Sequence, residues 1–296
     1  MTPEIEQLAR SLESAGYIAD PSIATAVYLA RAMGRPLLVE GDAGVGKTEL
    51  AKVLARLQKT DLIRLQCYEG LDVQTALYEW DYPRQLLMLR VAEDEGARGS
   101  ALEKRIFSRE YLLERPLLAA ITHAEGPAVL LIDEIDRADD AFEAFLLEVL
   151  SDFQVSIPEI GTVRAEHPPF VVLTSNHTRE LGDALRRRCL YLYIEHPSIE
   201  KEVRIIQSRC PEADGTLSTE VARFLAALRK VGLVKAPGIA ETLDFTRALL
   251  TLKQDGLEPY VVAQTIGCLL KDRRDLATVS PSELASMVAR AREVEP

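Results

Sequence analysis

Short apolar runs alternate with stretches of helical spacing over the first two thirds of the chain. Five such runs predict strands, at Leu37–Val39, Leu62–Gln66, Val129–Ile132, Phe170–Thr174 and Leu190–Ile194. Helical spacing predicts helices at Ile23–Met33, Glu49–Leu57, Arg109–Thr122 (with Pro116 as a candidate break) and Ala141–Leu150. Such alternation is typical of a parallel sheet that is covered by helices on both faces. The run Val129–Ile132 contains no polar residue, as expected of a strand buried on both sides.

The strand signals stop after the His196-Pro197 pair. Helical spacing then continues through Ser198–Ser208, Ser218–Lys230, Glu241–Leu252, Pro259–Lys271 and Pro281–Glu293. The clearest helix start is at Ser280, because a proline follows at the first helical position and Glu283 can complete a capping box. We therefore predict an αβ domain over residues 1–197 and a small helical domain over residues 198–296. Pro197 marks a candidate hinge, since proline disfavours helix at the residue before it.

The charge of the chain is unevenly distributed. The net charge is −11, yet residues 198–296 carry 14 basic and 14 acidic residues, so the acidic excess lies in residues 1–197. This argues against non-specific binding of nucleic acid, which depends on Lys and Arg neutralising phosphates, although a small local patch stays open.

Other bulk features point to a protein of the reducing cytoplasm. No apolar run has the length of a membrane span, and the start of the chain is acidic and unlike a signal peptide. The four cysteines are scattered, at Cys67, Cys189, Cys210 and Cys268. They therefore support neither a disulfide framework nor a metal cluster. The polar, glycine-containing segment Ala92–Ser100 predicts an exposed loop.

The segment that follows the first predicted strand matches the phosphate-binding pattern G-x-x-x-x-G-K-[ST]. Glycines let the backbone wrap around an anion, and the amides of the loop and of the next helix N-terminus then point at the phosphates. Lys47 is expected to reach the β- and γ-phosphates, and the Thr48 hydroxyl to hold Mg²⁺. The predicted contacts to ATP are Gly41, Asp42, Ala43, Gly44, Val45, Gly46, Lys47, Thr48 and Glu49. The alternative is a glycine-rich turn with an accidental lysine, which the strand–loop–helix context disfavours.

Two later strand ends carry side chains suited to ATP hydrolysis. Asp133 and Glu134 follow an apolar run, so Asp133 would complete the Mg²⁺ shell while Glu134 orients and polarises the attacking water. Asn176 follows the next strand and could hydrogen-bond the γ-phosphate or that water. Taken alone, the acidic pair fits a solvated strand end, and Asn176 fits a turn or cap. The phosphate-binding loop upstream favours the catalytic interpretation.

Three consecutive arginines, Arg186, Arg187 and Arg188, lie in an otherwise acidic region. They form either a solvated basic turn or an arginine finger. Such a finger is a guanidinium that reaches the γ-phosphate of a neighbouring subunit and offsets its developing charge. The residues alone leave both interpretations open.

These motifs in this order, followed by helices, resemble the AAA+ ATPases. GDAGVGKT is similar to their Walker A motif, VLLIDE to Walker B, and Asn176 to sensor 1. ALRRRCLY resembles the arginine-finger region, which makes Arg188 the first candidate and Arg186 the second, with Cys189 where an aromatic residue is common. LDFTRAL stands at sensor 2, which implies that Arg247 contacts the γ-phosphate. The resemblance implies a P-loop NTPase αβα sandwich with a parallel sheet and an all-helical lid.

Within the AAA+ ATPases, DEIDRA and FLLEVL resemble the MoxR family. Residues 70–108 would then form an insertion in the second helix, and residues 153–167 a β-hairpin before sensor 1. Alternation in Gln154–Ile157, with turn residues after it, supports the hairpin independently. The phrases ALYEWDYPRQLL, IPEIGTVRA and LTSNHTRELGDALRRRCLY are most similar to the CoxD-like ATPases of carbon monoxide dehydrogenase maturation.

The MoxR resemblance implies an ATP-dependent, Mg²⁺-dependent remodelling ATPase or chaperone that forms a homo-oligomer, usually a hexameric ring. It also implies a von Willebrand factor A domain partner and a molybdenum hydroxylase client. Arg247 would act on the nucleotide of its own subunit and Arg188 on that of a neighbour. Tyr17 and Ile18 would line the adenine pocket, although Tyr17 fits a core position equally well. Three alternatives stay open: a nucleic-acid motor, a scaffold that hydrolyses little ATP, and a Rubisco-activase-like MoxR remodeller.

Overall fold

The computed structural model describes residues 2–94 and 100–293. The chain divides into two compact units. The sheet unit comprises Ser22–Glu40 and Ala51–Leu192, and the lid unit comprises Met1–Pro21, Gly41–Leu50 and Tyr193–Pro296. The predicted domain boundary after residue 197, with its hinge, stays a prediction.

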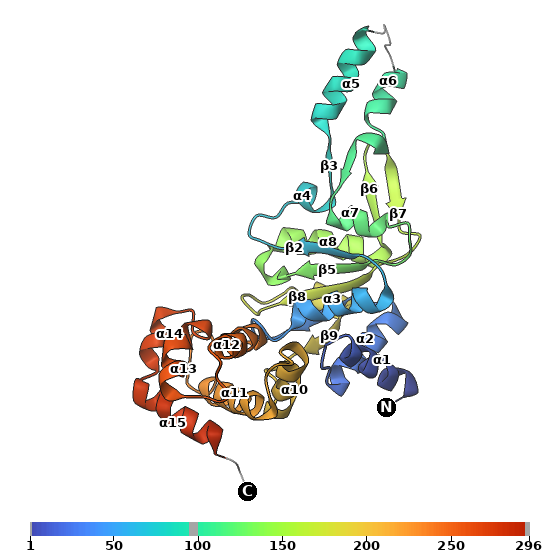
Figure 1. Ribbon diagram of the computed structural model, residues 1–296. Coiled ribbons are helices and arrows are strands. Elements are labelled where there is room, and N and C mark those ends of the chain that lie inside the picture. Colours follow the sequence, from blue (N-terminus) through green and yellow to red (C-terminus); the bar gives the residue numbers. More distant parts are fainter. Residues whose placement is uncertain (1, 95–99, 294–296) are drawn as a thin grey trace. The chain divides into compact units, whose positions relative to one another are not determined.

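A five-stranded sheet forms the centre of the sheet unit, with the strand order β2-β5-β8-β1-β9 (Figure 1). The strands are β1 (Leu37–Glu40), β2 (Leu62–Gln66), β5 (Val129–Asp133), β8 (Phe170–Ser175) and β9 (Leu190–Tyr193). Strands β2, β5, β8 and β1 pair in parallel in that order. The parallel sheet predicted from the apolar runs is therefore confirmed. Because the strands are parallel, the carboxyl ends of β2, β5, β8 and β1 meet at one edge of the sheet.

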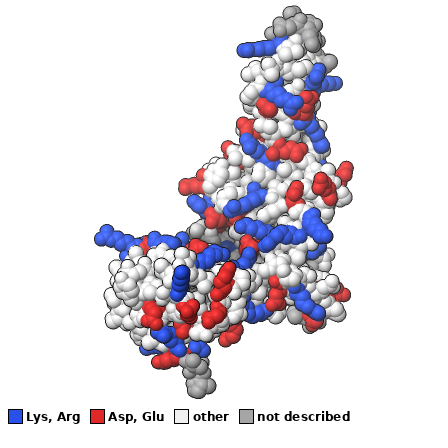
Figure 2. Space-filling model, in the orientation of Figure 1, with Lys and Arg blue, Asp and Glu red and all other residues white. Residues whose placement is uncertain are grey.

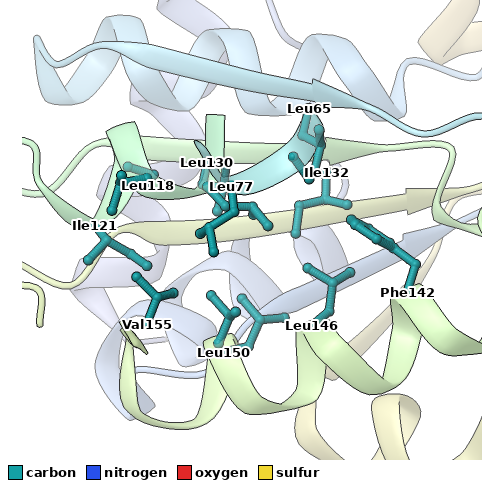
Figure 3. Packing of buried hydrophobic residues seen from close by; sticks show 14 of the residues in the cluster. Leu65, Leu77, Leu118, Ile121, Leu130, Ile132, Phe142, Leu146, Leu150 and Val155 are labelled. Atoms are coloured by element: carbon teal, nitrogen blue, oxygen red, sulfur yellow. The ribbon is translucent and has the colours of Figure 1, made fainter. Parts of the chain in front are cut away.

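The main core of the sheet unit lies between one face of the sheet and the helices α7 (Pro116–Ile121) and α8 (Asp140–Asp152). Ile132 of β5 points toward Phe142 of α8 in this core (Figure 3). Leu131 points to the opposite face, because side chains alternate along a strand, and it is also fully buried. Both faces of β5 are therefore covered, as its unbroken apolar run predicts.

Helices α2 (Pro21–Met33), α3 (Lys47–Gln58) and α8 agree with the predicted helices to within two residues at each end. The predicted helix Arg109–Thr122 is wrong in its first half. Arg109–Tyr111 forms a 3₁₀ turn (η1) and Leu112–Glu114 forms strand β4, so the helix begins only at Pro116. Proline has no amide hydrogen and is favoured at the first helical position, which explains why α7 starts there.

Residues 70–108, predicted as an insertion, contain α4 (Val73–Leu77), β3 (Tyr78–Trp80), α5 (Tyr82–Asp94) and α6 (Ser100–Ile106), and β3 pairs antiparallel with β4. Helices α5 and α6 extend away from the five-stranded sheet (Figure 1). The loop predicted at Ala92–Ser100 is wrong at both ends. Ala92 is buried within α5 and Ser100 begins α6, while residues 95–99 lie outside the described residues.

The hairpin predicted before sensor 1 is present. Strand β6 (Gln154–Ile157) pairs antiparallel with β7 (Gly161–Arg164). Val155, Ile157 and Val163 point into the core of the sheet unit, which agrees with the alternation along the hairpin. Two short helical segments follow β5 and β8, namely the 3₁₀ turn η2 (Ile135–Arg137) and helix α9 (Asp183–Arg188).

The C-terminal part of the lid unit is helical, as predicted. It contains α10 (Ile199–Arg209), α11 (Gly215–Leu228), α12 (Ile239–Thr251), α13 (Pro259–Thr265), the 3₁₀ turn η3 (Ile266–Cys268), α14 (Arg273–Thr278) and α15 (Pro281–Arg292). The rings of Phe224 and Phe245 stack in its core with centroids 6.0 Å apart. Ser280 and Glu283 form the predicted capping box.

The helix predictions for the lid unit need two corrections. The helix predicted at Pro259–Lys271 ends at Thr265, after which the chain tightens into η3. Helices α14 and α1 (Pro3–Ser14) are additional to those predicted. In the chain that the structure describes, no helix combines the length and the apolar character that crossing a membrane requires.

Candidate functional site

The glycine-rich loop of the lid unit has the backbone conformation that its glycines allow. Gly41, Gly44 and Gly46 have φ angles of 152°, 81° and 97°, which side chains rarely tolerate. A Cβ atom at Gly41 would lie 2.2 Å from the carbonyl oxygen of Ile194. Helix α3 begins at Lys47, directly after the loop. The first amides of a helix lack intrahelical partners, so the loop and helix end together have a geometry that favours an anion.

Lys47 is buried and lies across the loop. Its Nζ donates to the carbonyl oxygens of Gly41 and Asp42, each at 2.7 Å. Glu49 in the first turn of α3 accepts from Arg209 at 2.7 Å, so α10 is tied to the start of α3. Thr48, between the two, carries the hydroxyl predicted to bind Mg²⁺. The sequence-predicted phosphate-binding residues thus form one continuous loop and helix start.

The N-terminus of α12 packs directly on the glycine-rich loop within the lid unit. The amide of Ile239 donates to the carbonyl oxygen of Gly44 at 2.8 Å. A Cβ atom at Gly238 would lie 2.6 Å from the Cα of Gly44, so only glycine fits this contact. Glu241 caps the helix by accepting from the amide of Gly238 at 3.0 Å. The loop backbone and the first residue of α12 are therefore in direct contact.

Tyr17 and Ile239 both lie beside Gly46. A Cβ atom at Gly46 would be 3.8 Å from Tyr17 Cε2 and 3.9 Å from Ile239 Cδ1. Burial raises the pKa of the Tyr17 phenol well above its usual value, with Asp20 and Glu49 adding to the effect, so the ring is neutral. Ile18 is buried beside it in sequence. Tyr17 thus lies at the loop, and the expected role of Tyr17 and Ile18 in an adenine pocket stays a prediction.

A buried ion pair holds the segment that precedes α12. The Arg229 guanidinium makes two parallel bonds to Glu202, both at 2.7 Å, and its Nε donates to the carbonyl oxygen of Pro237 at 2.8 Å. The side chain of Glu202 is fully buried and also accepts from Thr242. A bidentate arginine fixes orientation as well as distance, so it sets the position of the backbone next to Gly238.

Arg247, which the resemblance implies as sensor 2, lies away from the glycine-rich loop. It is the ninth residue of α12, about 12 Å along the helix axis from Ile239. Its side chain is 56% exposed and pairs with Asp244 at 3.3 Å. The structure therefore does not bring Arg247 to the residues around Gly44, and its role stays a prediction.

In the sheet unit, Asp133 and Glu134 lie where β5 ends. Thr174 of β8 donates its hydroxyl to Asp133 at 2.5 Å and accepts from the amide of Glu134 at 2.9 Å. Glu134 has φ 56° and ψ 51°, a left-handed conformation that is uncommon for a residue with a side chain. Backbone strain of this kind is held only where the surrounding contacts impose it, and it is concentrated at functional sites. Arg64 of β2 binds Asp133 at 2.6 Å.

Three side chains surround the carboxylate of Glu134. Asn176 Nδ2 lies 3.4 Å from Oε1, while Gln66 Nε2 and Arg137 Nη1 each lie 3.1 Å from Oε2. The backbone amide of Asn176 is held by Asp136 at 3.1 Å. The predicted pair of Glu134 and Asn176 is therefore brought together, on neighbouring strand ends of the sheet unit.

The three consecutive arginines differ in their contacts. Arg186 Nη2 lies 3.2 Å from the fully buried carboxylate of Glu40, the last residue of β1, which also contacts His177 at 3.1 Å. Arg188 is exposed and donates to the carbonyl oxygen of Leu147 at 2.6 Å. Arg187 is also exposed. Arg186 is thus bound to a buried carboxylate of its own subunit, whereas Arg188 donates to a carbonyl oxygen at the surface.

Arg64, Gln66 and Arg137 also contact the two carboxylates, and no motif in the sequence marks them. Arg64 and Gln66 alternate with apolar residues along β2, a pattern that puts both on one face. That signal becomes useful only once β2 is known to neighbour β5, where Gln66 is in register with Asp133. Arg137 lies three residues after Glu134, within the turn η2.

Part of the chain matches a known protein family. Residues 36–189, just over half of the chain, match the family described as AAA domain (dynein-related subfamily). Gas vesicle ATPase GvpN of Haloferax mediterranei is 26% identical over 237 residues, which cover 74% of this chain and 66% of that protein. Gas vesicle ATPase GvpN1 of Halobacterium salinarum is 24% identical over 274 residues, or 88% of this chain and 71% of that one. The chain thus spans about two thirds of the length of these relatives.

A solved structure is also similar in fold. A point mutant of Thermotoga maritima RuvB superimposes with a TM-score of 0.50 and 18% sequence identity, covering 94% of this chain and 72% of that one. At this level of identity the likeness concerns the fold alone.

Proposed function

The chain belongs to the AAA+ ATPases, in the dynein-related subfamily of the AAA domain, and we propose that it uses ATP hydrolysis to remodel a protein partner. Membership of this family, together with relatives that are themselves named ATPases, makes the protein a nucleotide-binding ATPase. The fold agrees with the prediction, since a parallel five-stranded sheet with helices precedes a helical C-terminal part.

Binding of the nucleotide is assigned to the glycine-rich loop. The positive φ angles of Gly41, Gly44 and Gly46 leave the loop amides free to face phosphate oxygens, and Lys47 brings a positive charge to them. Mg²⁺ keeps several waters and takes one or two protein ligands together with phosphate oxygens. The Thr48 hydroxyl and the Asp133 carboxylate fit that donor set. When bound, the ion would offset charge on the β- and γ-phosphates.

Hydrolysis is assigned to Glu134 as the residue that orients and polarises water. Its left-handed backbone and its contact with Asn176 support this role. β1, which leads into the glycine-rich loop, neighbours β8, and β8 neighbours β5, so the relevant chain segments leave one edge of the sheet. Asn176 would then hold either the water or the γ-phosphate.

The observation that carries the proposed remodelling is the hydrogen bond between Ile239 and Gly44. Through this bond the backbone of the phosphate-binding loop is joined to the first residue of α12, with the glycine pair Gly44 and Gly238 in van der Waals contact. A change in the loop on phosphate release would therefore move α12. Such a contact would let a ligand that binds the loop favour one position of α12 over another.

Arg188 is proposed as an arginine finger that acts on a neighbouring subunit of a homo-oligomeric, hexameric ring. Its exposed side chain would leave the Leu147 carbonyl and reach the γ-phosphate. Arg186 is the weaker candidate, because leaving Glu40 would strand a fully buried carboxylate without its cation. An arginine finger in trans implies that turnover depends on assembly.

The proposed client is inferred from the sequence resemblance and not from a binding site in the structure. The CoxD-like phrases favour a molybdenum hydroxylase client with a von Willebrand factor A domain partner, in the cytoplasm. The gas vesicle relatives are named ATPases, which supports the ATPase activity but not a particular client. A Rubisco-activase-like remodeller would differ only in its client.

A nucleic-acid motor is the second candidate, because RuvB shares the fold. On the face shown in Figure 2, acidic and basic side chains are interspersed, without the continuous basic surface that backbone binding uses. Stimulation of ATP turnover by DNA or RNA, measured at two salt concentrations, would favour this alternative.

The test of the proposed function compares Lys47→Ala, Glu134→Gln and Arg188→Ala with the unmodified protein. Lys47→Ala is expected to lose nucleotide binding. Glu134→Gln and Arg188→Ala are expected to keep the affinity for a fluorescent ATP analogue while kcat falls about a thousandfold or more. Full turnover by dilute, monomeric protein would overturn the finger assignment. Glu134→Gln with unchanged kcat would overturn the hydrolytic site.

A further inference from the structure

The C-terminal carbonyls of helix α9, which carries the three arginines, have an unusual set of partners. A helix leaves its last four carbonyls without intrahelical donors. The carbonyls of Leu185 and Arg186 accept from the amide of Cys189 at its C-cap. Those of Arg187 and Arg188 accept instead from a side chain that is far away in sequence, Arg35.

Arg35 lies between α2 and β1, and its guanidinium makes three bonds to this one helix end. Nη2 donates to the carbonyl oxygen of Arg187 at 2.5 Å and to that of Cys189 at 3.2 Å, while Nε donates to that of Arg188 at 3.1 Å. The next residue along, Pro36, accepts from the amide of Leu190 at 2.8 Å. Arg35 and Pro36 therefore hold four consecutive residues, from Arg187 to Leu190.

Arginine is well suited to this position. The planar guanidinium presents several N–H donors in a fixed arrangement, so binding three carbonyls also fixes the rotation of the helix end. The cation is favoured at a helix C-terminus, where the carbonyls carry partial negative charge. A fourth cation next to Arg186, Arg187 and Arg188 is nevertheless repelled by them. The three hydrogen bonds to carbonyl oxygens compensate for this repulsion. We therefore attribute the position of Arg35 to its contacts with the end of α9 rather than to a general surface charge.

We propose that Arg35 is a positioning residue for the arginine finger. It sets the direction in which α9 presents Arg188 to a neighbouring subunit, without itself contacting the nucleotide. The inference rests on the proposed function, in which Arg188 acts in trans. Since a displacement of a catalytic group by about 1 Å can cost about a hundredfold in rate, the loss of three bonds at the base of the finger is expected to be measurable.

The first measurement compares Arg35→Ala with Arg35→Lys and with a control, Arg31→Ala. Arg31 is an exposed arginine in α2 whose side chain makes no hydrogen bond or ion pair within the described part of the chain. Arg35→Ala is expected to lower kcat about ten- to a hundredfold at unchanged affinity for ATP. Arg35→Lys should recover part of kcat, because an ammonium can replace one or two of the three bonds. Arg31→Ala should match the unmodified protein.

The second measurement tests whether the effect acts in trans. Arg35→Ala is mixed with Glu134→Gln, which hydrolyses little itself but donates an intact finger. Turnover should rise to about a quarter of the unmodified rate in an equimolar mixture, since half the subunits can hydrolyse and half of those receive an intact finger. Arg188→Ala mixed with Glu134→Gln is the matched control and should recover equally.

Each outcome bears on the proposal. If Arg35→Ala turns over ATP at the unmodified rate, the positioning role is overturned. If Arg188→Ala is complemented by Glu134→Gln but Arg35→Ala is not, Arg35 supports its own subunit only, and the proposed function stands without this inference. If neither is complemented, the finger in trans fails and the inference fails with it. Should Arg35→Ala lose its thermal transition, the same comparison is made with Arg35→Lys, for which partial loss and recovery on mixing are expected.

Discussion

Gln66 donates its side-chain amide to the carboxylate of Glu134, with 3.1 Å between Nε2 and Oε2. Arg137 donates to the same oxygen at the same distance. Two hydrogen bonds on one oxygen hold the carboxylate in one orientation. In the proposed mechanism Gln66 therefore restrains Glu134, and release of this bond would accompany activation.

Replacement of Gln66 by alanine is expected to raise the basal kcat for ATP about two- to tenfold, because a carboxylate released from Gln66 can turn toward the attacking water. KM should change little. Steady-state turnover at saturating Mg-ATP measures the effect, and the double variant with Glu134→Gln should stay inactive as a control. A fall in kcat instead would show that Gln66 aims the carboxylate rather than restrains it.

The fold could be predicted where the local pattern and the burial agree. The unbroken apolar run of β5 is buried on both faces, and the capping residues at Ser280 start a helix as expected. The prediction failed where a long-range partner decides the local structure. Helical spacing predicts that Leu112–Glu114 belongs to a helix. In the structure these residues instead pair with β3, which lies more than thirty residues earlier in the chain.

The site could be predicted where one segment carries its own chemistry. The glycine-rich loop and the pair of Asp133 and Glu134 need only their own sequence to be identified. Gln66 and Arg35 could not be found this way, because each acts on a residue of another strand or helix and nothing in their own segment marks it. The role of Arg247 stays a prediction. It comes from a family pattern, and two turns of α12 separate Arg247 from the helix end that contacts Gly44.

Gly238→Ala is expected to weaken ATP binding. The added Cβ would lie 2.6 Å from Gly44 Cα and 2.9 Å from the carbonyl oxygen of Ala43, so the phosphate-binding backbone must move. We expect Kd for ATP to rise by about tenfold, or about 1.4 kcal/mol. Gly267→Ala is the matched control, since a Cβ there meets no atom within 4 Å. Fluorescence titration with an ATP analogue compares the two, and equal affinities would show that the contact at Gly44 is not tight in solution.

Arg229→Leu is expected to destabilise the lid unit by about 3–5 kcal/mol, because it leaves the fully buried Glu202 carboxylate without its cation. The free energy of unfolding is measured by urea denaturation. Arg292→Ala removes one partner of an exposed pair with Glu258 and should cost at most about 1 kcal/mol. Adding Glu202→Leu to Arg229→Leu should recover much of the loss. If the double variant is no more stable than Arg229→Leu, the penalty comes from lost packing rather than from an unpaired charge.

His196 is expected to make stability depend on pH in the acid range. Burial lowers the pKa of its imidazole from 6.5, and Arg229 lowers it further, while Asp42 at 3.2 Å and Glu202 oppose the shift. The folded state therefore takes up this proton less readily than the unfolded chain. As the pH falls below 6.5, the unfolded state binds the proton first and stability decreases until the folded pKa is reached; above 6.5 the contribution is fully present.

His196→Gln should therefore lose less stability than the unmodified protein when the pH is lowered below 6.5. His123 serves as the opposite case in the sheet unit. Its Nδ1 donates to the carbonyl oxygen of Gly126 at 2.8 Å, which raises the pKa above 6.5, with a contribution from Asp61. His123 thus stabilises the fold below 6.5, and that stabilisation disappears as the pH rises through its folded pKa. His123→Gln should make the protein more sensitive to acid, and His196→Gln less so. Thermal denaturation of the three proteins across this range measures both effects, and parallel curves of Tm against pH would show that neither imidazole is linked to folding.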